Sequence, residues 1–482
     1  AQAGAPRCAG ADRRDQYKPT VKREAEAARR RAALATQQSE ARADRVADFR
    51  RVALDSLLAS GPGAGAEEED VQVEADEDDA ADGPEGQDVS MGREAGCRKV
   101  RRLRMLQRTL FFARQFQMPD WMVEAPEDLA ASWLLMVKPE GDRCLLLSEG
   151  GQVMVRRKNG FILERYPDCR LPPGLTILDV VCMEGPRPAA GGAPRGGEPM
   201  APEEEGAEEE EGAEEAGDLD VNMGGGGRGG SRGQAAGRGG RRRRPVGDRK
   251  YAVMDVLVWG DQDLAGAEAE CRMFWLASRF SELREQVPRR ARPLMLVPAT
   301  PASPEALQHA YHSDAGYPKD SLLFLHRAGH YSVSEAVTPL VLLWRDRQIS
   351  RFVVDTPDEK GEVLPERQAV VLEVRGGGQL RTADRTVVAQ LGEEQLAEVG
   401  RLVQAKSLRQ KALLRCEVQG VDLAARRLGG ARPVAHVTAK SRVWADSWGR
   451  IAFQHLHRTG QAAAVSFDVV MRAAAGGAAA PK

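Results

Sequence analysis

Short apolar runs separated by turn residues begin at about residue 98 and predict a sheet-rich domain. A basic segment with Leu and Phe comes first and has the character of a helix, and the runs WLLMV, RCLLLS, QVMVRR and TILDVVCM follow it. Runs of this length, bounded by turn signals, are typical of strands in an antiparallel or mixed sheet. The pattern stops at about 186 and resumes at 249 with RKYAVMDVLVWG.

The interruption at 186–248 has low complexity. An acidic run, EEEGAEEEEGAEE, is followed by the Arg-Gly run GGGGRGGSRGQAAGRGGRRRRP. Neither run can bury apolar area, so we expect a disordered loop inserted within one domain that spans 98–355. The GGRGG elements offer contacts to RNA, but we favour a solvated insertion without a site.

Beyond residue 249 the pattern predicts further strands and then an extension. The expected strands are CRMFWLASRF, PLMLVPA, DSLLFLHRAGHYS, TPLVLLW and FVVDTP. Residues 356–460 form an extension of unknown role, with the strand-like runs AVVLEV and LLRCEV and a helical stretch at EEQLAEVGRLVQAKSLRQKALL. Residues 461–482, rich in Ala and Gly, are expected to be a disordered tail.

The N-terminal part reads as a basic helix followed by a linker. Ala, Arg, Glu and Gln dominate 15–55, and these residues favour helix. Leu34, Val46 and Phe49 are among its few apolar positions, so this helix has no core of its own and needs a partner to be stable. Residues 56–97 carry a long acidic stretch and predict a disordered linker.

The composition indicates the cellular compartment of the chain but says little about its function. The net charge of −2 averages basic and acidic blocks that lie apart in sequence. Seven cysteines, an odd number without a C-x-x-C pair, argue against a disulfide framework or a zinc ribbon and favour a reducing compartment. No apolar run approaches twenty residues, so we expect no membrane span.

Two regions together resemble the snurportin family. The basic arm is similar to the importin-β-binding segment of snurportin in its QYK, its Arg cluster at 29–31 and its closing Arg pair. Residues 119–133 (PDWMVEAPEDLAASW) and 137–161 (VKPEGDRCLLLSEGGQVMVRRKNGF) resemble the start and the first hairpin of the snurportin cap-binding domain. TILDVVCMEG, YAVMDVLVWG, RMFWLASRF, DSLLFLHRAGHYS and TPLVLLW follow in the family's order.

The resemblance implies a fold, a ligand and a route. The fold would be α+β, a mixed two-sheet guanylyltransferase-like cap-binding domain preceded by a helical, partly disordered N-terminal arm. The ligand would be the 2,2,7-trimethylguanosine cap of spliceosomal small nuclear RNAs. The partners would be importin-β, the capped ribonucleoprotein and an exportin for recycling, with shuttling between nucleus and cytoplasm and no membrane. The importin-binding residues would be Lys18, Lys22, Arg23, Arg29, Arg30, Arg31, Arg50 and Arg51.

Five residues are the candidates for reading the cap. A methylated guanine is a delocalised cation, so it favours an indole face, and the resemblance gives this role to Trp121 and Trp344. The TPLV run places the family's tryptophan where this chain has Leu343, and a shift of one residue in a strand turns a side chain to the opposite face unless a bulge compensates. Lys138, Arg143 and Lys158 would lie at the rim and the phosphates.

Covalent nucleotidyltransfer is the rival hypothesis. Residues 138–143 read K-P-E-G-D-R, close to the K-x-D-G-x-R motif of mRNA guanylyltransferases and ligases, in which the lysine is the nucleophile. Two departures count against it: Glu140 replaces the aspartate, and apolar residues stand at 341–343, where lysines should meet the phosphate. We therefore expect that the chain is not an enzyme and uses no cofactor. We also expect no metal site, because His326 and His330 lack an evident third ligand.

Overall fold

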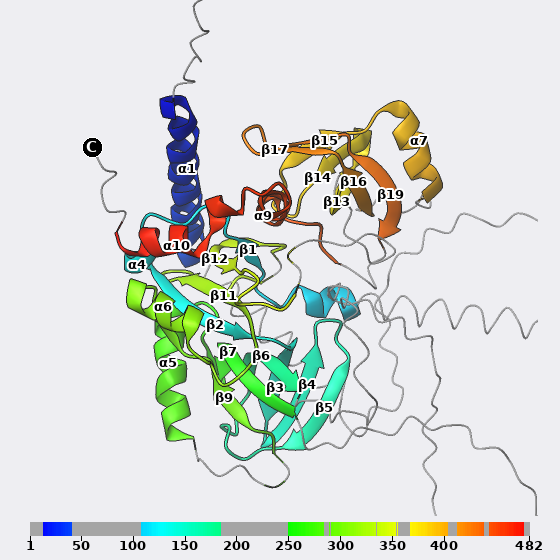
Figure 1. Ribbon diagram of the computed structural model, residues 1–482. Coiled ribbons are helices and arrows are strands. Elements are labelled where there is room, and N and C mark those ends of the chain that lie inside the picture. Colours follow the sequence, from blue (N-terminus) through cyan, green and yellow to red (C-terminus); the bar gives the residue numbers. More distant parts are fainter. Residues whose placement is uncertain are drawn as a thin grey trace, which may run out of the picture.

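The computed structural model describes residues 13–40, 108–184, 249–283, 289, 291–333, 335–352, 354, 367–402, 412–437 and 443–476. Within the first range, side chains are described only for 24–38. The acidic linker, the low-complexity insertion, and Arg50 and Arg51 of the arm lie outside the described residues. Figure 1 shows a two-sheet body with a smaller barrel-like domain beside it.

The larger sheet is built from the long apolar runs on both sides of the insertion. Its order is β5-β4-β3-β6-β7-β8, with β9 added parallel to β7. Glu184 pairs with Arg249, so the chain leaves and re-enters the same sheet on either side of residues 185–248. The strands are β3 (Asp142–Glu149), β4 (Gln152–Arg157), β5 (Ile162–Pro167), β6 (Thr176–Glu184), β7 (Arg249–Trp259), β8 (Gln262–Asp263) and β9 (Leu294–Leu296).

A second sheet faces the first across an apolar core. Its order is β1-β12-β11-β2-β10, and leucine, methionine and valine side chains from both sheets form one buried cluster. The predicted α+β class with two facing sheets is thus confirmed. The strands are β1 (Pro119–Trp121), β2 (Trp133–Pro139), β10 (Ala299–Pro301), β11 (Lys319–His326) and β12 (Thr338–Trp344).

One predicted strand is a helix. CRMFWLASRF lies within α5 (Ala269–Glu282), which buries Ala269, Arg272, Met273 and Leu276. The spacing of these residues follows the 3.6-residue turn of a helix, which an apolar run alone does not reveal. Two more helices cover the outer face of the second sheet, α4 (Leu129–Ser132) and α6 (Pro304–His312).

Residues 367–437 form a second domain with its own core. Its sheet has the order β15-β14-β13-β16-β19, with all pairs antiparallel and a helix between the third and fourth strands. This is the arrangement of an OB-fold, a small partly open barrel. We call it the OB-like domain. Its elements are β13 (Gln368–Arg375), η1 (Gly376–Gly378), β14 (Gln379–Arg381), β15 (Val387–Gln390), α7 (Glu393–Leu402), β16 (Ala412–Val418), β17 (Gly420–Asp422), β18 (Arg427–Gly429) and β19 (Arg432–Val437).

One helix joins the two domains. In α9 (Trp448–Arg458), Phe453 and Leu456 pack into the core of the two-sheet domain, while Trp448 and Ile451 pack into that of the OB-like domain. Figure 1 shows α9 between the two bodies. The chain then continues as η2 (Ala462–Val465) and α10 (Phe467–Ala474), so the expectation of a disordered tail from 461 is wrong up to residue 476.

The basic arm is helical and lies against the two-sheet domain. In α1 (Arg13–Glu40), Gln38 donates to Ser332 Oγ at 2.5 Å and accepts from the His330 backbone at 3.0 Å. Arg31 is buried, pairs with Glu24 at 2.5 Å and lies over Trp133. The partner that the sequence demanded for this helix is here the chain itself. None of the described helices is long and apolar enough to cross a membrane.

Candidate functional site

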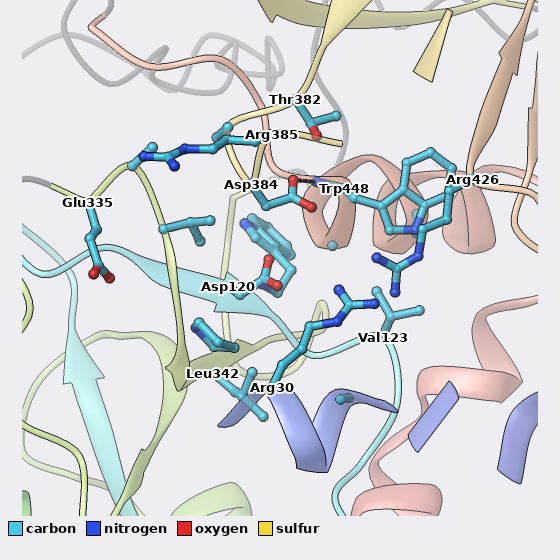
Figure 2. Close-up of a pocket in the computed structure, with 18 of the residues that line it drawn as sticks. Arg30, Asp120, Val123, Glu335, Leu342, Thr382, Asp384, Arg385, Arg426 and Trp448 are labelled. Atoms are coloured by element: carbon cyan, nitrogen blue, oxygen red, sulfur yellow. Dashed lines mark hydrogen bonds between the residues drawn. The ribbon is translucent and has the colours of Figure 1, made fainter. Parts of the chain in front are cut away.

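A cleft of about 890 Å³ opens where the two domains meet, and we call it the junction cleft. Its walls come from α1, from β1 and the segment leading into β12, and from the OB-like domain with the start of α9. Figure 2 shows Arg30, Asp120, Asp384 and Arg426 directed into this space. Three tryptophans line it: Trp121, Trp444 and Trp448. A volume of this size suits a ligand of several hundred daltons.

Trp121 comes from the edge strand β1, which pairs in parallel with β12 and aligns Trp121 with Leu343. The ring is partly exposed and tilts against Phe453 at a centroid distance of 5.1 Å. The guanidinium carbons of Arg345 and Arg450 lie 5.0 and 6.0 Å from the ring centroid. The indole therefore already attracts planar cations, as its quadrupole predicts.

Asp120 holds a carboxylate at the centre of the cleft. It accepts from the Trp121 backbone N–H at 2.9 Å, and the α9 backbone at Gly449 comes so close that a Cβ there would lie 2.4 Å from Asp120 Oδ1. Burial, and then the nearby Asp384 carboxylate, raise the pKa of Asp120 to about 7. Burial disfavours the charged form of a carboxyl, and so does a like charge.

This raised pKa predicts a pH-dependent stability that Asp120→Asn removes. Asp120 keeps its proton to about pH 7 when folded, against an ordinary pKa of 3.8. Folding therefore takes up a proton between these values, and stability falls as the pH rises from 4 to 7. We expect Asp120→Asn to match the wild type near pH 4 and to exceed it by about 2–4 kcal/mol at pH 8. Urea denaturation at both pH values measures this, and an equal difference at the two would contradict it.

The cleft carries both signs of charge in equal number. Of the side chains lining it, six are basic and six acidic, which gives a formal balance of 6 − 6 = 0. Arg31 pairs with Glu24, and Arg375 with Glu373. Such a lining suits a ligand that carries charges of both signs. The basic residues are Arg30, Arg31, Arg375, Arg381, Arg385 and Arg426; the acidic ones are Glu24, Asp120, Glu124, Glu335, Glu373 and Asp384.

Lys138 reaches this region through two other charges. Its ammonium lies 2.7 Å from Asp320 Oδ2, and Arg345, which covers Trp121, lies 3.4 Å from Asp320 Oδ1. These two cations, in that order, offset the burial of Asp320 and lower its pKa. Asp320 thus links Lys138 to Arg345, which covers Trp121. The two predicted residues Lys138 and Trp121 therefore belong to one network.

The space between the two sheets is nearly closed. The cavity there measures only about 30 Å³, room for about one water molecule. Arg143 lines it and donates to Asp179 from Nε and Nη2, with the shortest contact at 2.5 Å, while Nη1 donates to the Gln117 carbonyl. Tyr331 donates to the same carboxylate at 2.8 Å. Asp255 pairs likewise with buried Arg272 at 2.8 Å, so an arginine engages each of these two carboxylates.

A family model matches this two-sheet domain. Residues 115–182 and 244–345 match the model described as "Snurportin1, m3G cap-binding domain". Over these residues the chain is similar to a snurportin cap-binding domain. The suspected resemblance is confirmed over these residues, and a cap-binding role fits the domain. The OB-like wall of the junction cleft lies beyond the match, since the matched residues end at 345.

Two solved structures are also similar to the chain. The ligase domain of LigD from M. tuberculosis has 11% sequence identity and a TM-score of 0.29; the match covers 69% of this chain and 98% of that one. A mycobacterial DNA ligase D complexed with ATP and MES has 12% identity and a TM-score of 0.28, covering 69% and 99%.

Trp344 does not lie at a ligand site in this snurportin-type domain. The side chain is fully buried, donates from Nε1 to the Val465 carbonyl at 2.7 Å and packs beside Tyr311 and Phe467. Leu343 instead packs against the core between the sheets. The shift of one residue has turned the tryptophan to the outer face, with no compensating bulge in the β11–β12 pairing. The prediction of an accessible stacking platform is therefore wrong for this arrangement.

Lys158 occupies a tight turn between β4 and β5. Gly160 has a φ of 78°, and Asn159 Oδ1 accepts from the Phe161 backbone at 3.1 Å, as the Asn-Gly signal predicts. Cys144 of β3 pairs with Arg157 of β4, so Lys158 lies at the end of the sheet where β3 begins, next to Arg143. Lys158 and Arg143 therefore share one end of the larger sheet. Neither is among the residues that line the junction cleft.

Sequence reasoning missed the residues that the C-terminal part adds to the cleft. Trp444 and Trp448 bring indole rings, Asp384 accepts from the Trp448 backbone at 2.8 Å, and Arg385 and Arg426 bring charge. The one signal was the count of seven tryptophans in a chain poor in aromatics. Trp133 and Trp259 are buried in the core, and Trp275 is partly buried on α5.

Proposed function

We propose that this chain binds the 2,2,7-trimethylguanosine cap of small nuclear RNAs and passes the ribonucleoprotein to importin-β through its basic arm. The observation that carries the proposal is Trp121, whose partly exposed ring lies in the junction cleft of a snurportin cap-binding domain with two guanidinium groups upon it. A methylated guanine is a planar delocalised cation, and it would occupy the kind of position that those groups now hold.

The charges of the cleft support the same ligand. A cap combines a cationic base with an anionic triphosphate bridge, and the cleft combines carboxylates with arginines in equal number. Asp120, next to Trp121 in sequence, would meet the cationic edge of the base. Arg345 and Lys138 are not among the residues that line the cleft, and they would meet the bridge from beside the Trp121 ring, which Arg345 covers. Hydrogen bonds between ionised partners are shorter and stronger than neutral ones, which suits recognition of both ends.

We propose a binding role rather than catalysis. Lys138 would need a free Nζ to attack a nucleotide, and this atom is held by Asp320 Oδ2 at 2.7 Å. Glu140, at the motif's aspartate position, pairs with Arg351. Incubation with GTP and Mg²⁺ should therefore leave the intact mass of the protein unchanged. A mass increase of one GMP that disappears in Lys138→Arg would contradict this and favour guanylyltransferase-like chemistry.

The arm supports the adaptor role through its charge. Residues 1–54 hold thirteen Lys and Arg against seven Asp and Glu, a surplus of 13 − 7 = 6. Arg29 and Arg30 are exposed on α1, whereas Arg31 is buried against the two-sheet domain. Lys18, Lys22 and Arg23 lie on the same helix, and their side chains are outside the described residues. Importin-β would bind α1 after this helix dissociates from the two-sheet domain.

One retention assay tests both halves of the proposal. The full chain should be retained on immobilised trimethylguanosine cap, be released by free cap analogue but not by GTP, and carry importin-β with it. A full chain in which Lys22, Arg23 and Arg29 are each replaced by Glu keeps α1 as a wall of the cleft, and it should still be retained but should leave importin-β in solution. Failure of the full chain to bind the resin would refute cap binding, and retention of importin-β by the charge-reversed chain would refute the role of the arm.

A further inference from the structure

The OB-like domain presents to the junction cleft the elements that bind ligands in other OB-folds. Those elements are the face of the second and third strands and the loop between the fourth and fifth. Here Arg381 and Arg385 come from β14 and from the loop that joins it to β15, and Arg426 comes from the turn between β17 and β18, which lies between the fourth and fifth strands of the barrel. All three line the cleft.

Two of these arginines sit on unusual backbone. Arg385 has a φ of 65° and Arg426 a φ of 52°, in the left-handed region that residues with a Cβ seldom adopt. Such positions cost free energy and gather at functional sites. Gly or Asn at these positions would reduce the cost, yet both turns carry an arginine that lines the cleft.

The guanidinium group of Arg385 is directed toward open space, whereas that of Arg426 also acts on the Asp120 carboxyl across the cleft. Arg385 is exposed, and within the described part of the chain its side chain makes no hydrogen bond or ion pair. Figure 2 shows the Arg30 side chain of α1 and that of Arg426 pointing toward each other across the cleft. Two like charges that converge on one space favour an anion between them.

Two carboxylates of the OB-like wall, Asp384 and Glu373, bond within the protein. Asp384 accepts from the Trp448 backbone at 2.8 Å and from Thr386 Oγ1 at 2.8 Å. Glu373 pairs with Arg375. Trp444, which leads into α9, adds a partly exposed indole to the same wall, and an indole accepts a base of any identity by stacking.

We propose that this wall binds the RNA chain that follows the cap, with Arg385 and Arg426 on its phosphates and Trp444 stacked on a base. The inference rests on the proposed cap binding at Trp121, which lines the same cleft. It gives residues 367–448 a function that the snurportin match, ending at residue 345, does not cover. The protein then recognises a capped RNA as a cap joined to a single strand.

The test compares ligands and matched variants of the full chain by fluorescence anisotropy. We expect a trimethylguanosine-capped hexanucleotide to bind roughly tenfold more tightly than the cap dinucleotide. Arg385→Gln with Arg426→Gln should remove most of that gain and reduce the salt dependence, while the affinity for the dinucleotide changes less than about twofold. The control is Arg401→Gln with Arg427→Gln, which removes the same charge from exposed residues of the same domain that do not line the cleft.

Each outcome bears on one of the two proposals. Equal affinities for capped hexanucleotide and dinucleotide, or equal losses in the cleft and control variants, would overturn the RNA-binding wall and leave cap binding intact. No affinity for the dinucleotide would overturn the proposed function instead. An uncapped hexanucleotide then still tests the wall, because its weaker binding should fall in the cleft variant and persist in the control.

Discussion

Trp121→Ala should lower the affinity for the trimethylguanosine cap by about 5- to 150-fold, and Trp121→Phe by less. Base–aromatic stacking contributes about 1–3 kcal/mol, which converts to that range. Loss of the ring also removes the surface on which Arg345 and Arg450 lie, so two cations near the ligand lose their positioning. Isothermal titration calorimetry measures the effect without relying on the fluorescence of the residue that is replaced.

Trp275→Ala is the matched control for this experiment. Trp275 lies on α5, outside the junction cleft, and Arg279 covers its ring at 4.6 Å, so it has the same kind of cation–π contact. We expect its loss to leave cap affinity within about twofold of the wild type. Equal weakening by both substitutions would mean that the loss of an indole acts through stability, and the assignment of Trp121 to the cap would fail.

Trp344→Ala should destabilise the fold by about 3–5 kcal/mol, the usual cost of removing a large aromatic side chain from a core. The residue is fully buried, and its truncation leaves the Val465 carbonyl without its 2.7 Å donor. Tyr311 and Phe467, which stack on each other at 3.9 Å, would lose the neighbour that holds η2 and α10 in place. Urea denaturation followed by circular dichroism measures the loss.

The cap affinity of folded Trp344→Ala should remain close to that of the wild type. Trp344→Phe is the conservative variant, and it should recover part of the stability because most of the buried volume returns. The opposite pattern, near-normal stability with cap binding abolished, would restore the stacking role that the family resemblance gave to this tryptophan.

The strands of the two-sheet domain were predictable because their apolar runs are long and bounded by turns. The runs around Leu135, Leu146 and Val180 all became buried strands. The segment at 269–282 was not, since an apolar run fits a strand and a helix alike until its burial pattern is seen. The prediction of a disordered tail was wrong for a related reason. The side chains of Val470 and Ala474 are buried in the cluster that contains Trp133 and Trp344, and the sequence of the tail alone does not reveal that contact.

The site was predictable only where a family pattern reached it. Trp121 carried over by resemblance and lies in the cleft, but Arg143 and Asp179 are 36 residues apart, and no spacing rule indicates their ion pair. The arginines of the OB-like domain line the same cleft as Trp121 only because α9 packs between the two domains. The face of Trp344 depended on one residue of register, which the sequence raised as a question and the strand pairing decided.

Cap binding at Trp121 is measured by titrating the full chain with three cap dinucleotides, trimethylated, monomethylated and unmethylated. Tryptophan fluorescence reports binding, because stacking on Trp121 would quench the indole. We expect saturable quenching at micromolar or lower concentrations by the trimethylated cap and much weaker quenching by the unmethylated one, which lacks the cationic base. Absence of quenching by every cap, or equal quenching by all three, would show that Trp121 does not bind the cap.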